Sequence, residues 1–206
     1  MAGFGLRPVR MQGGKPMSGS VKKYYISSSN SDACGIGSPV LKTGDMNTAV
    51  VKSAMSSYDI GTLHEVTPAA ASVIGDGLPL TGVIVGIEPI ASDLSKNYVP
   101  ASTEVVVSVC DDPDVVFEIQ ASAAITAAAS VGLNAVLYGA GVSTATGKST
   151  VQLDATSDTP AADASNQLLI LGPARRATLD YTGLPVFEVL IINHTESQQN
   201  LNVGIS

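Results

Sequence analysis

The letters Gly147-Lys148-Ser149 are those that end a phosphate-binding P-loop, and they are the first place where residue type and spacing could support chemistry. A P-loop has another glycine five residues before its second glycine, but position 142 is Val and Gly141 is one residue out of register. Residues 150–154 then alternate like a strand, whereas a P-loop opens a helix whose N-terminal amides hold the phosphates. We therefore interpret this segment as a hairpin loop.

Three carboxylates lie close together at Asp111, Asp112 and Asp114, and carboxylate oxygens are ligands that Ca²⁺ prefers. Pro113 interrupts the set, and no glutamate follows at the spacing of the twelve-residue calcium loop. We favour a solvated turn over a calcium site. The sequence predicts no metal and no cofactor.

The two histidines, His64 and His194, are far apart, and with only two scattered cysteines they do not supply the ligands of a zinc site. A nucleophilic serine on a strained elbow would need the pattern G-x-S-x-G, which does not occur. We interpret both histidines as ordinary residues. No catalytic residue and no enzymatic activity are expected.

The stretch that would have to position any site is residues 103–120. Apolar side chains alternate over 105–109 and again over 115–119, which predicts two half-buried strands. The intervening Asp111-Asp112-Pro113-Asp114 has the proline and aspartates typical of a tight turn. We expect the two strands to pair as a β-hairpin.

Short apolar runs separated by turn residues predict strands along most of the chain. They lie near 21–27, 38–43, 47–53, 61–66, 81–88, 103–110, 115–120, 134–138, 149–153, 166–171 and 186–193. One short helix is expected at 127–131, where Thr126 can cap the start and Gly132 the end. This pattern favours a mostly β fold, a short-strand barrel or sandwich with at most one or two short helices.

The expected organisation has three parts. They are an extended basic N-terminal arm at 1–20, an N-terminal β unit at 21–100 and a C-terminal β unit at 101–206 that contains the hairpin. The arm has no sustained apolar period, so we expect it to become ordered only against a partner. The alternative is one continuous β domain after the arm.

The net charge of −7 is distributed unevenly. Residues 1–31 carry +5, and the other six cations and eighteen acidic residues leave −12 on the rest. An acidic body argues against nucleic acid as the main partner, because phosphate binding needs a basic face. The candidates for contact with an acidic partner protein are therefore the cations of the first part, Arg7, Arg10, Lys15, Lys22 and Lys23.

Arg175 and Arg176 are the one adjacent pair of cations in the acidic body. They either meet a carboxylate of a neighbouring subunit or form an exposed pair in a loop, and the sequence leaves both interpretations open. They are the candidate subunit-interface residues.

Charged residues make up only 14% of the chain, against about 25% in ordinary soluble domains. Hydrophobic residues make up 45%, with no Trp, so the core must be aliphatic. A surface so poor in charge suits a protein of a stable assembly. The first residues show no apolar stretch typical of a signal peptide, and no run approaches the length of a membrane span, so we expect a soluble protein made in a reducing cytoplasm, without a membrane partner.

The order of several blocks resembles the head decoration, or cement, proteins of tailed bacteriophages. The blocks are MAGFGLRPVR, DDPDVVFEIQ, VGLNAVL, GAG, TGKS, VQLD, NQLLILGPA and EVLIINH. The likeness covers 100–194 best and is looser over 24–99, and after Arg176 this chain has Ala-Thr-Leu-Asp where similar chains tend to have Pro-Asp-Asn. The resemblance implies a mostly β subunit that forms homotrimers on the outside of the icosahedral head and stabilises the lattice of the major capsid protein.

Residues and resemblance together predict a virion structural protein that is made in the host cytoplasm and located on the outer surface of the head. In this hypothesis the cations of the arm lie across the capsid lattice, while the β body trimerises and bridges capsomers. A tail or fibre component of the same virion is one alternative. A host-surface carbohydrate-binding β module is another alternative. Sugar sites usually present aromatic side chains, and Tyr24-Tyr25 is the one aromatic pair in this sequence, so this alternative is weaker.

Overall fold

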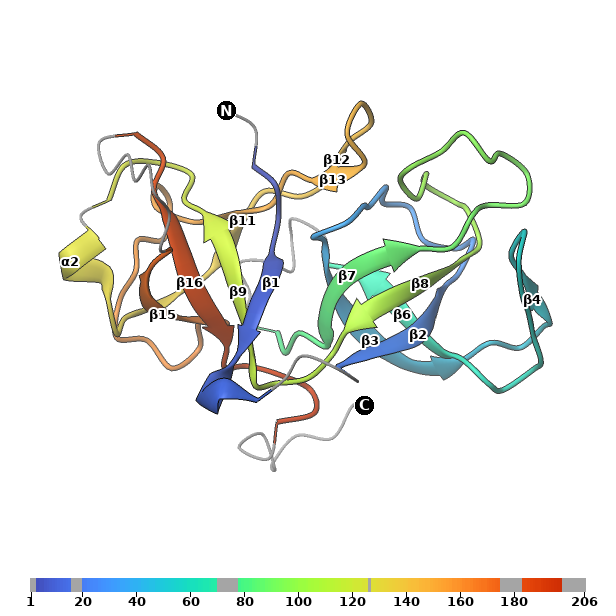
Figure 1. Cartoon of the computed structure of the whole chain (residues 1–206), viewed down its shortest axis with the longest axis horizontal. Helices are drawn as coiled ribbons and strands as arrows, with labels where there is room; N and C mark the ends of the chain where they lie inside the picture. Colours follow the sequence, from blue (N-terminus) through green and yellow to red (C-terminus); the bar gives the residue numbers. More distant parts are fainter. Residues whose placement is uncertain (1–2, 16–19, 70–77, 126, 175–182, 198–206) are drawn as a thin grey trace.

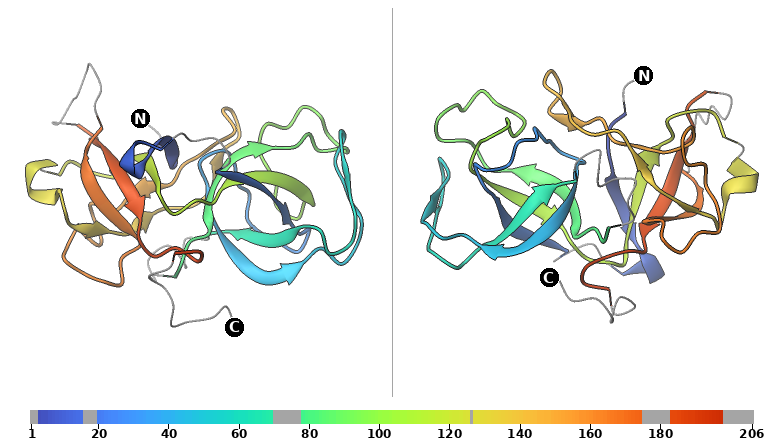
Figure 2. Two further views of the ribbon diagram at one scale, coloured as in Figure 1. Left: turned by 60° about the horizontal axis from the view of Figure 1, so that its bottom comes forward. Right: turned by 180° about the vertical axis from the view of Figure 1, so that it is seen from behind.

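The computed structural model describes residues 3–15, 20–69, 78–125, 127–174 and 183–197, which form two β units lying side by side (Figure 1). One unit is a closed five-stranded barrel, and the other is a five-stranded antiparallel sheet. The views from below and from behind show the same two units next to each other (Figure 2). The prediction of a mostly β fold is confirmed.

The barrel strands follow the order β2-β6-β3-β7-β8, and β8 closes the ring by pairing with β2. Their bounds are β2 (Val21–Ile26), β3 (Pro39–Met46), β6 (His64–Pro68), β7 (Gly82–Ile87) and β8 (Val105–Cys110). β2 and β6 are parallel, and the other neighbours are antiparallel. Val and Ile dominate β7 and β8, since branched side chains fit a pleated, buried surface.

The sheet strands follow the order β1-β9-β16-β15-β10. Their bounds are β1 (Arg7–Met11), β9 (Val115–Gln120), β16 (Val186–Ile191), β15 (Leu168–Pro173) and β10 (Asn134–Ala135). β16 alternates partly and fully buried residues as its sequence predicts, whereas every residue of β9 is buried.

Shorter elements decorate both units. They are η1 (Gln12–Gly14), α2 (Ala127–Ser130), and the strand pairs β4 (Val51–Lys52) with β5 (Ser57–Tyr58), β11 (Leu137–Tyr138) with β14 (Gln152–Leu153) and β12 (Val142–Ser143) with β13 (Lys148–Ser149). The helix expected at 127–131 is confirmed as the single turn α2. The predicted hairpin loop at Gly147-Lys148-Ser149 is confirmed for Gly147 alone, because Lys148 and Ser149 form β13, the second strand of that hairpin, which pairs with β12.

The predicted hairpin at 103–120 is wrong. β8 pairs with β2 and β7 of the barrel, and β9 pairs with β1 and β16 of the sheet, so the two strands are not partners. Residues 111–114 therefore connect the units instead of reversing the chain within one. Alternation along a strand shows which side chains share a face, but it does not show which strand lies beside it.

The expectation that residues 1–20 become ordered only against a partner is wrong for β1. This strand pairs with β9, and the apolar side chains of Leu6 and Met11 are 1% and 5% exposed. The segment has too few apolar residues to order itself alone, and the strand that orders it lies more than a hundred positions away in the sequence. The two units are also not divided at residue 100. β1, from the first part of the chain, belongs to the sheet, and β8, which follows residue 100, belongs to the barrel.

The largest apolar cluster runs from the sheet into the barrel. Phe117 and Phe187 come from the central strands of the sheet, and Leu80, Val83 and Cys110 come from the barrel side. A second cluster fills the barrel itself. The two units consequently share one core.

Both cysteines are buried free thiols. Burial raises the pKa of Cys34 to about 12 and that of Cys110 to about 11. Both side chains are therefore protonated and poorly reactive near neutral pH.

Candidate interface surface

Each of the five cations predicted to contact a partner lies beside a carboxylate of its own chain. The pairs are Arg7 with Glu118, Arg10 with Glu188, Lys15 with Asp114, Lys22 with Asp111 and Lys23 with Glu88. The five cationic side chains remain between 45% and 63% exposed. The positive start of the sequence is thus balanced inside the molecule, and contact of these side chains with a partner stays a prediction.

The two arginines of β1 neutralise a pair of facing carboxylates. Glu118 of β9 lies directly opposite Glu188 of β16, an arrangement of like charges that destabilises a sheet. Arg7 pairs with Glu118, and Arg10 donates two hydrogen bonds to one Glu188 oxygen, at 3.2 Å from Nε and 2.7 Å from a terminal nitrogen. Because both arginines come from β1, this strand lets two carboxylates share one face of the sheet.

Asp111 is a buried anion at the junction of barrel and sheet. Its side chain is 2% exposed, accepts a hydrogen bond of 2.8 Å from the Tyr24 hydroxyl and lies 2.8 Å from Lys22 Nζ. The hydrogen bond to Asp111 raises the pKa of Lys22, while burial and then Asp111 raise the pKa of Tyr24. The prediction of a solvated acidic turn is therefore wrong for Asp111, because Tyr24 and Lys22 replace its water.

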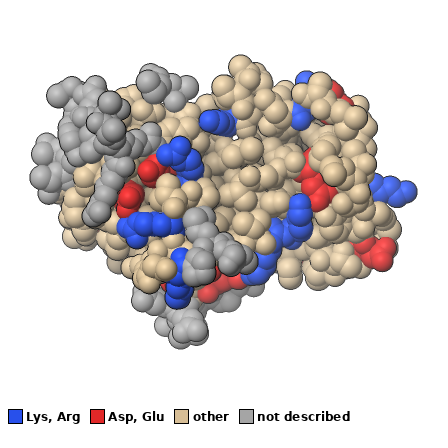
Figure 3. Space-filling view, in the orientation of Figure 1, with Lys and Arg blue, Asp and Glu red and all other residues tan. Residues whose placement is uncertain are grey.

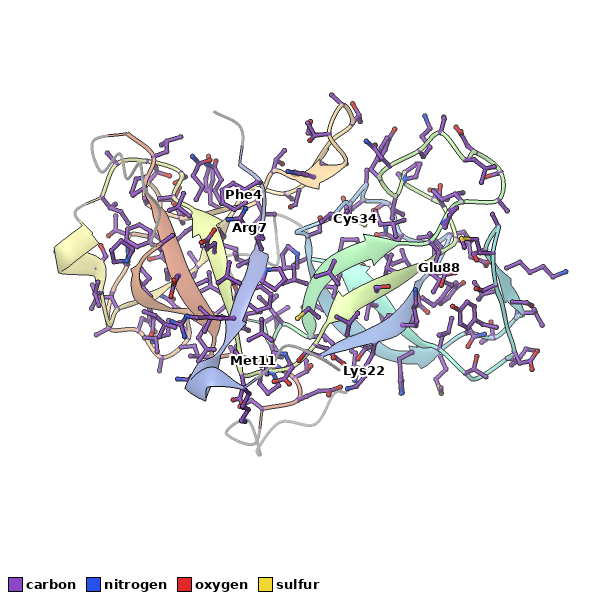
Figure 4. The ribbon with its side chains drawn as sticks, viewed as in Figure 1. Phe4, Arg7, Met11, Lys22, Cys34 and Glu88 are labelled. Carbon is purple, nitrogen blue, oxygen red and sulfur yellow. The ribbon has the colours of Figure 1, made fainter. Side chains whose placement is uncertain are left out.

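Glu88 anchors the β4–β5 hairpin to the barrel. Figure 4 labels Glu88. One of its oxygens accepts a hydrogen bond of 2.6 Å from the Tyr58 hydroxyl and lies 2.9 Å from Lys23 Nζ. Burial alone would raise the pKa of Glu88, but hydrogen bonds from Ser53, Tyr58 and Lys23 outweigh it, and the pKa is lowered. Glu88 is therefore charged at neutral pH and holds the hairpin in place.

Residues 193–197, here called the strap, return from the end of the sheet to the barrel. The backbone of Leu80 donates to the Asn193 carbonyl and accepts from the Thr195 amide, both at 2.9 Å. Glu196 pairs with Lys42 and, at 3.3 Å, with Lys22. The strap therefore fastens the two units through both backbone and charge.

His194, the second residue of the strap, is 1% exposed. Its Nδ1 accepts a 3.0 Å hydrogen bond from the backbone amide of Glu196. Burial lowers the pKa of His194, so the ring is neutral at neutral pH. His64, in contrast, is exposed on β6.

Among the described residues, the three most exposed large apolar side chains lie in two long segments that extend from the barrel (Figures 1 and 2). We call these the distal loops, residues 47–63 and 88–104. Met55 is 79% exposed, Ile60 63% and Val50 42% in the first loop, and Leu94 is 71% exposed in the second. Charged side chains cover only a small part of the molecular face that Figure 3 shows.

The remaining predicted positions add no chemical site. Arg175 and Arg176 lie outside the described residues, so their predicted role stays a prediction. Within the described ranges no three His, Cys, Asp or Glu side chains are grouped so that they could hold a metal ion. In the same ranges no helix is long and apolar enough to cross a membrane.

The pairs at this surface were not predicted, although their separate signals are present in the sequence. The repeated Phe-Glu segments at 117–118 and 187–188 and the Arg pair at 7 and 10 would have suggested them once β1, β9 and β16 were known to be neighbours. Comparison with known proteins finds no similar family model, curated protein or solved structure.

Proposed function

We propose that this chain is a decoration protein of a bacteriophage head, a non-enzymatic subunit that binds the outer surface of the shell as a trimer and stabilises the lattice of the major capsid protein. The proposal draws on the block order described above and on a chain with few charges. The observation that carries it is the exposure of large apolar side chains on the distal loops.

Apolar side chains this exposed are stabilising when another protein covers them. Burying one such side chain contributes roughly 1.5–3 kcal/mol. Met55, Ile60 and Leu94 together therefore offer several kcal/mol to an assembly. The distal loops are also held in fixed positions, since Glu88 binds Tyr58 and the Ala54 amide donates to the Pro89 carbonyl at 3.1 Å.

The fold changes the mechanism expected from the sequence alone. β1 belongs to the sheet of its own chain, so Arg7 and Arg10 would meet the shell through their exposed faces and not as parts of a free arm. The distal loops supply the apolar contact area in this mechanism, and the half-exposed cations supply orientation.

The test begins with the mass of the purified protein by light scattering, followed by mixing with phage heads that lack it. We expect a trimer that binds the heads and raises their melting temperature. The double variant M55S/I60S should bind at least about tenfold more weakly, whereas V131S, which changes a 45% exposed residue beside α2, should bind like the parent chain. A monomer that ignores the heads would refute the proposal.

A further inference from the structure

A cavity of about 340 Å³ opens where the sheet meets the barrel. Four separate segments line it: residues 4–8 at the start of β1, residues 36–37, residues 84–85 of β7, and Lys148 of β13. The lining is apolar except for two cations, Arg7 and Lys148. Figure 4 shows Phe4 and Arg7 together at this end of β1, and the guanidinium carbon lies 5.7 Å from the ring centre.

Backbone hydrogen bonds hold the walls of the cavity in place. The Leu6 amide donates to the Gly37 carbonyl at 2.9 Å, and the Gly37 amide donates to the Ile84 carbonyl at 2.8 Å. Ile36 is held from the other side, with its amide 3.0 Å from the Gly147 carbonyl and its carbonyl 2.8 Å from the Ser149 amide. The cavity is therefore preformed, which removes much of the ordering cost of binding.

Ile36 and Lys148 are the unusual residues of this cavity. Ile36 is 44% exposed even though its backbone is fixed on both sides. Lys148 makes no ion pair with the described residues, a property that it shares only with Lys52 among the nine described cations. An exposed apolar side chain beside an uncompensated cation is complementary to an apolar group that carries a carboxylate.

We infer that this cavity binds an extended acidic segment of a partner protein, in which an aliphatic side chain enters the cavity and an adjacent Asp or Glu pairs with Lys148. Arg7 adds positive charge at the rim, although Glu118 already occupies one of its nitrogens. The size fits this ligand, because 340 Å³ lies at the small end of ligand sites and matches one or two aliphatic side chains better than a cofactor. The inference does not depend on the proposed function, since the ligand is defined by its chemistry.

The test uses the intact protein and two blocked peptides, acetyl-Gly-Leu-Glu-Val-Gly-amide and its Gln counterpart, in an NMR titration of backbone amides. The Glu peptide should give saturable shifts at Ile36, Gly37 and Val85. The Gln peptide should bind about fivefold more weakly, the value of one exposed ion pair. The variant K148Q should lose the same factor, whereas K52Q, the matched control on β4, should not.

The first three outcomes that would overturn the inference come from the peptide titration. They are equal binding of the two peptides, equal binding by K148Q and the parent protein, or shifts centred on residues outside the cavity. Shifts of the same amides on dilution without peptide would place a second copy in the cavity and would also overturn it. The variants and controls change exposed side chains or the peptide alone, so the fold is preserved in each comparison.

Discussion

At the scale of single residues, Gly5 shows how closely the start of the chain packs against the barrel. It has a φ of +72°, and a Cβ at this position would lie 2.4 Å from the Gly37 carbonyl oxygen. That oxygen is a backbone atom that also accepts the Leu6 amide, so it cannot move aside cheaply. Gly5 is therefore required both for its backbone conformation and for its lack of a side chain.

Gly13 permits a matched comparison, because its φ is +73° but a Cβ added there would meet nothing within 4 Å. We predict that G13A lowers the free energy of unfolding by about 1–2 kcal/mol, the cost of the left-handed conformation alone. G5A should cost about 2–5 kcal/mol, since overpacking adds to that cost. Urea unfolding of both variants measures the difference, and equal losses would show that the contact with Gly37 carries no energy.

At the scale of elements, the strap links stability to pH through His194. The ring is buried among charged neighbours that include Glu196, Asp111, Asp112 and Lys42, and burial has the largest effect on its pKa. The folded protein therefore holds the neutral ring, whereas the unfolded chain takes up a proton near the ordinary pKa of 6.5. This contribution to stability is complete above pH 6.5 and is lost as the pH falls toward the lowered pKa of the folded state.

We predict that the free energy of unfolding falls between pH 7.5 and 5.5, by at most about 1.4 kcal/mol per pH unit below 6.5. The variant H194N keeps an acceptor for the Glu196 amide but cannot be protonated, so its stability should not fall over this range. H64N, at the exposed histidine, should behave like the parent protein. An unchanged pH slope in H194N would exclude the ring as its source.

Much of the strand content could be predicted from the sequence, but the pairing of the strands could not. The alternating Val and Ile residues of β7, β8 and β16 place these strands almost to the residue. β1 has too few apolar residues to stand out, and it is a strand because β9 offers it an open edge. The ion pairs follow from that pairing, and Arg7 lies 111 positions from Glu118.

At the scale of the whole molecule, the shared core makes the barrel and the sheet one cooperative unit. Phe187 of the sheet is fully buried in the cluster that also contains Val83 and Cys110 of the barrel. Removing that side chain should therefore weaken both units together. Tyr24 and Tyr25 belong to β2, so the NMR signals of their rings report on the barrel.

We predict that F187A lowers the free energy of unfolding by about 3–5 kcal/mol. The ring NMR signals of Tyr24 and Tyr25, which report on the barrel, and the total β signal should change in one transition at the same denaturant concentration, as in the parent protein. V131A, an exposed change, should leave the midpoint in place. A transition of the Tyr24 and Tyr25 signals that keeps the parent midpoint in F187A would mean that the barrel folds without the sheet.

The position of β1 also bears on how the chain folds while it is being made. β1 leaves the ribosome first, but β9, which completes its hydrogen bonds, follows about a hundred residues later, on the order of ten seconds at ordinary rates of translation. All five barrel strands emerge in that interval. During that interval the nascent chain carries β1 without its partner strand and Met11 without the cover of the sheet, so translation speed through residues 20–120 sets how long this segment is open to chaperones.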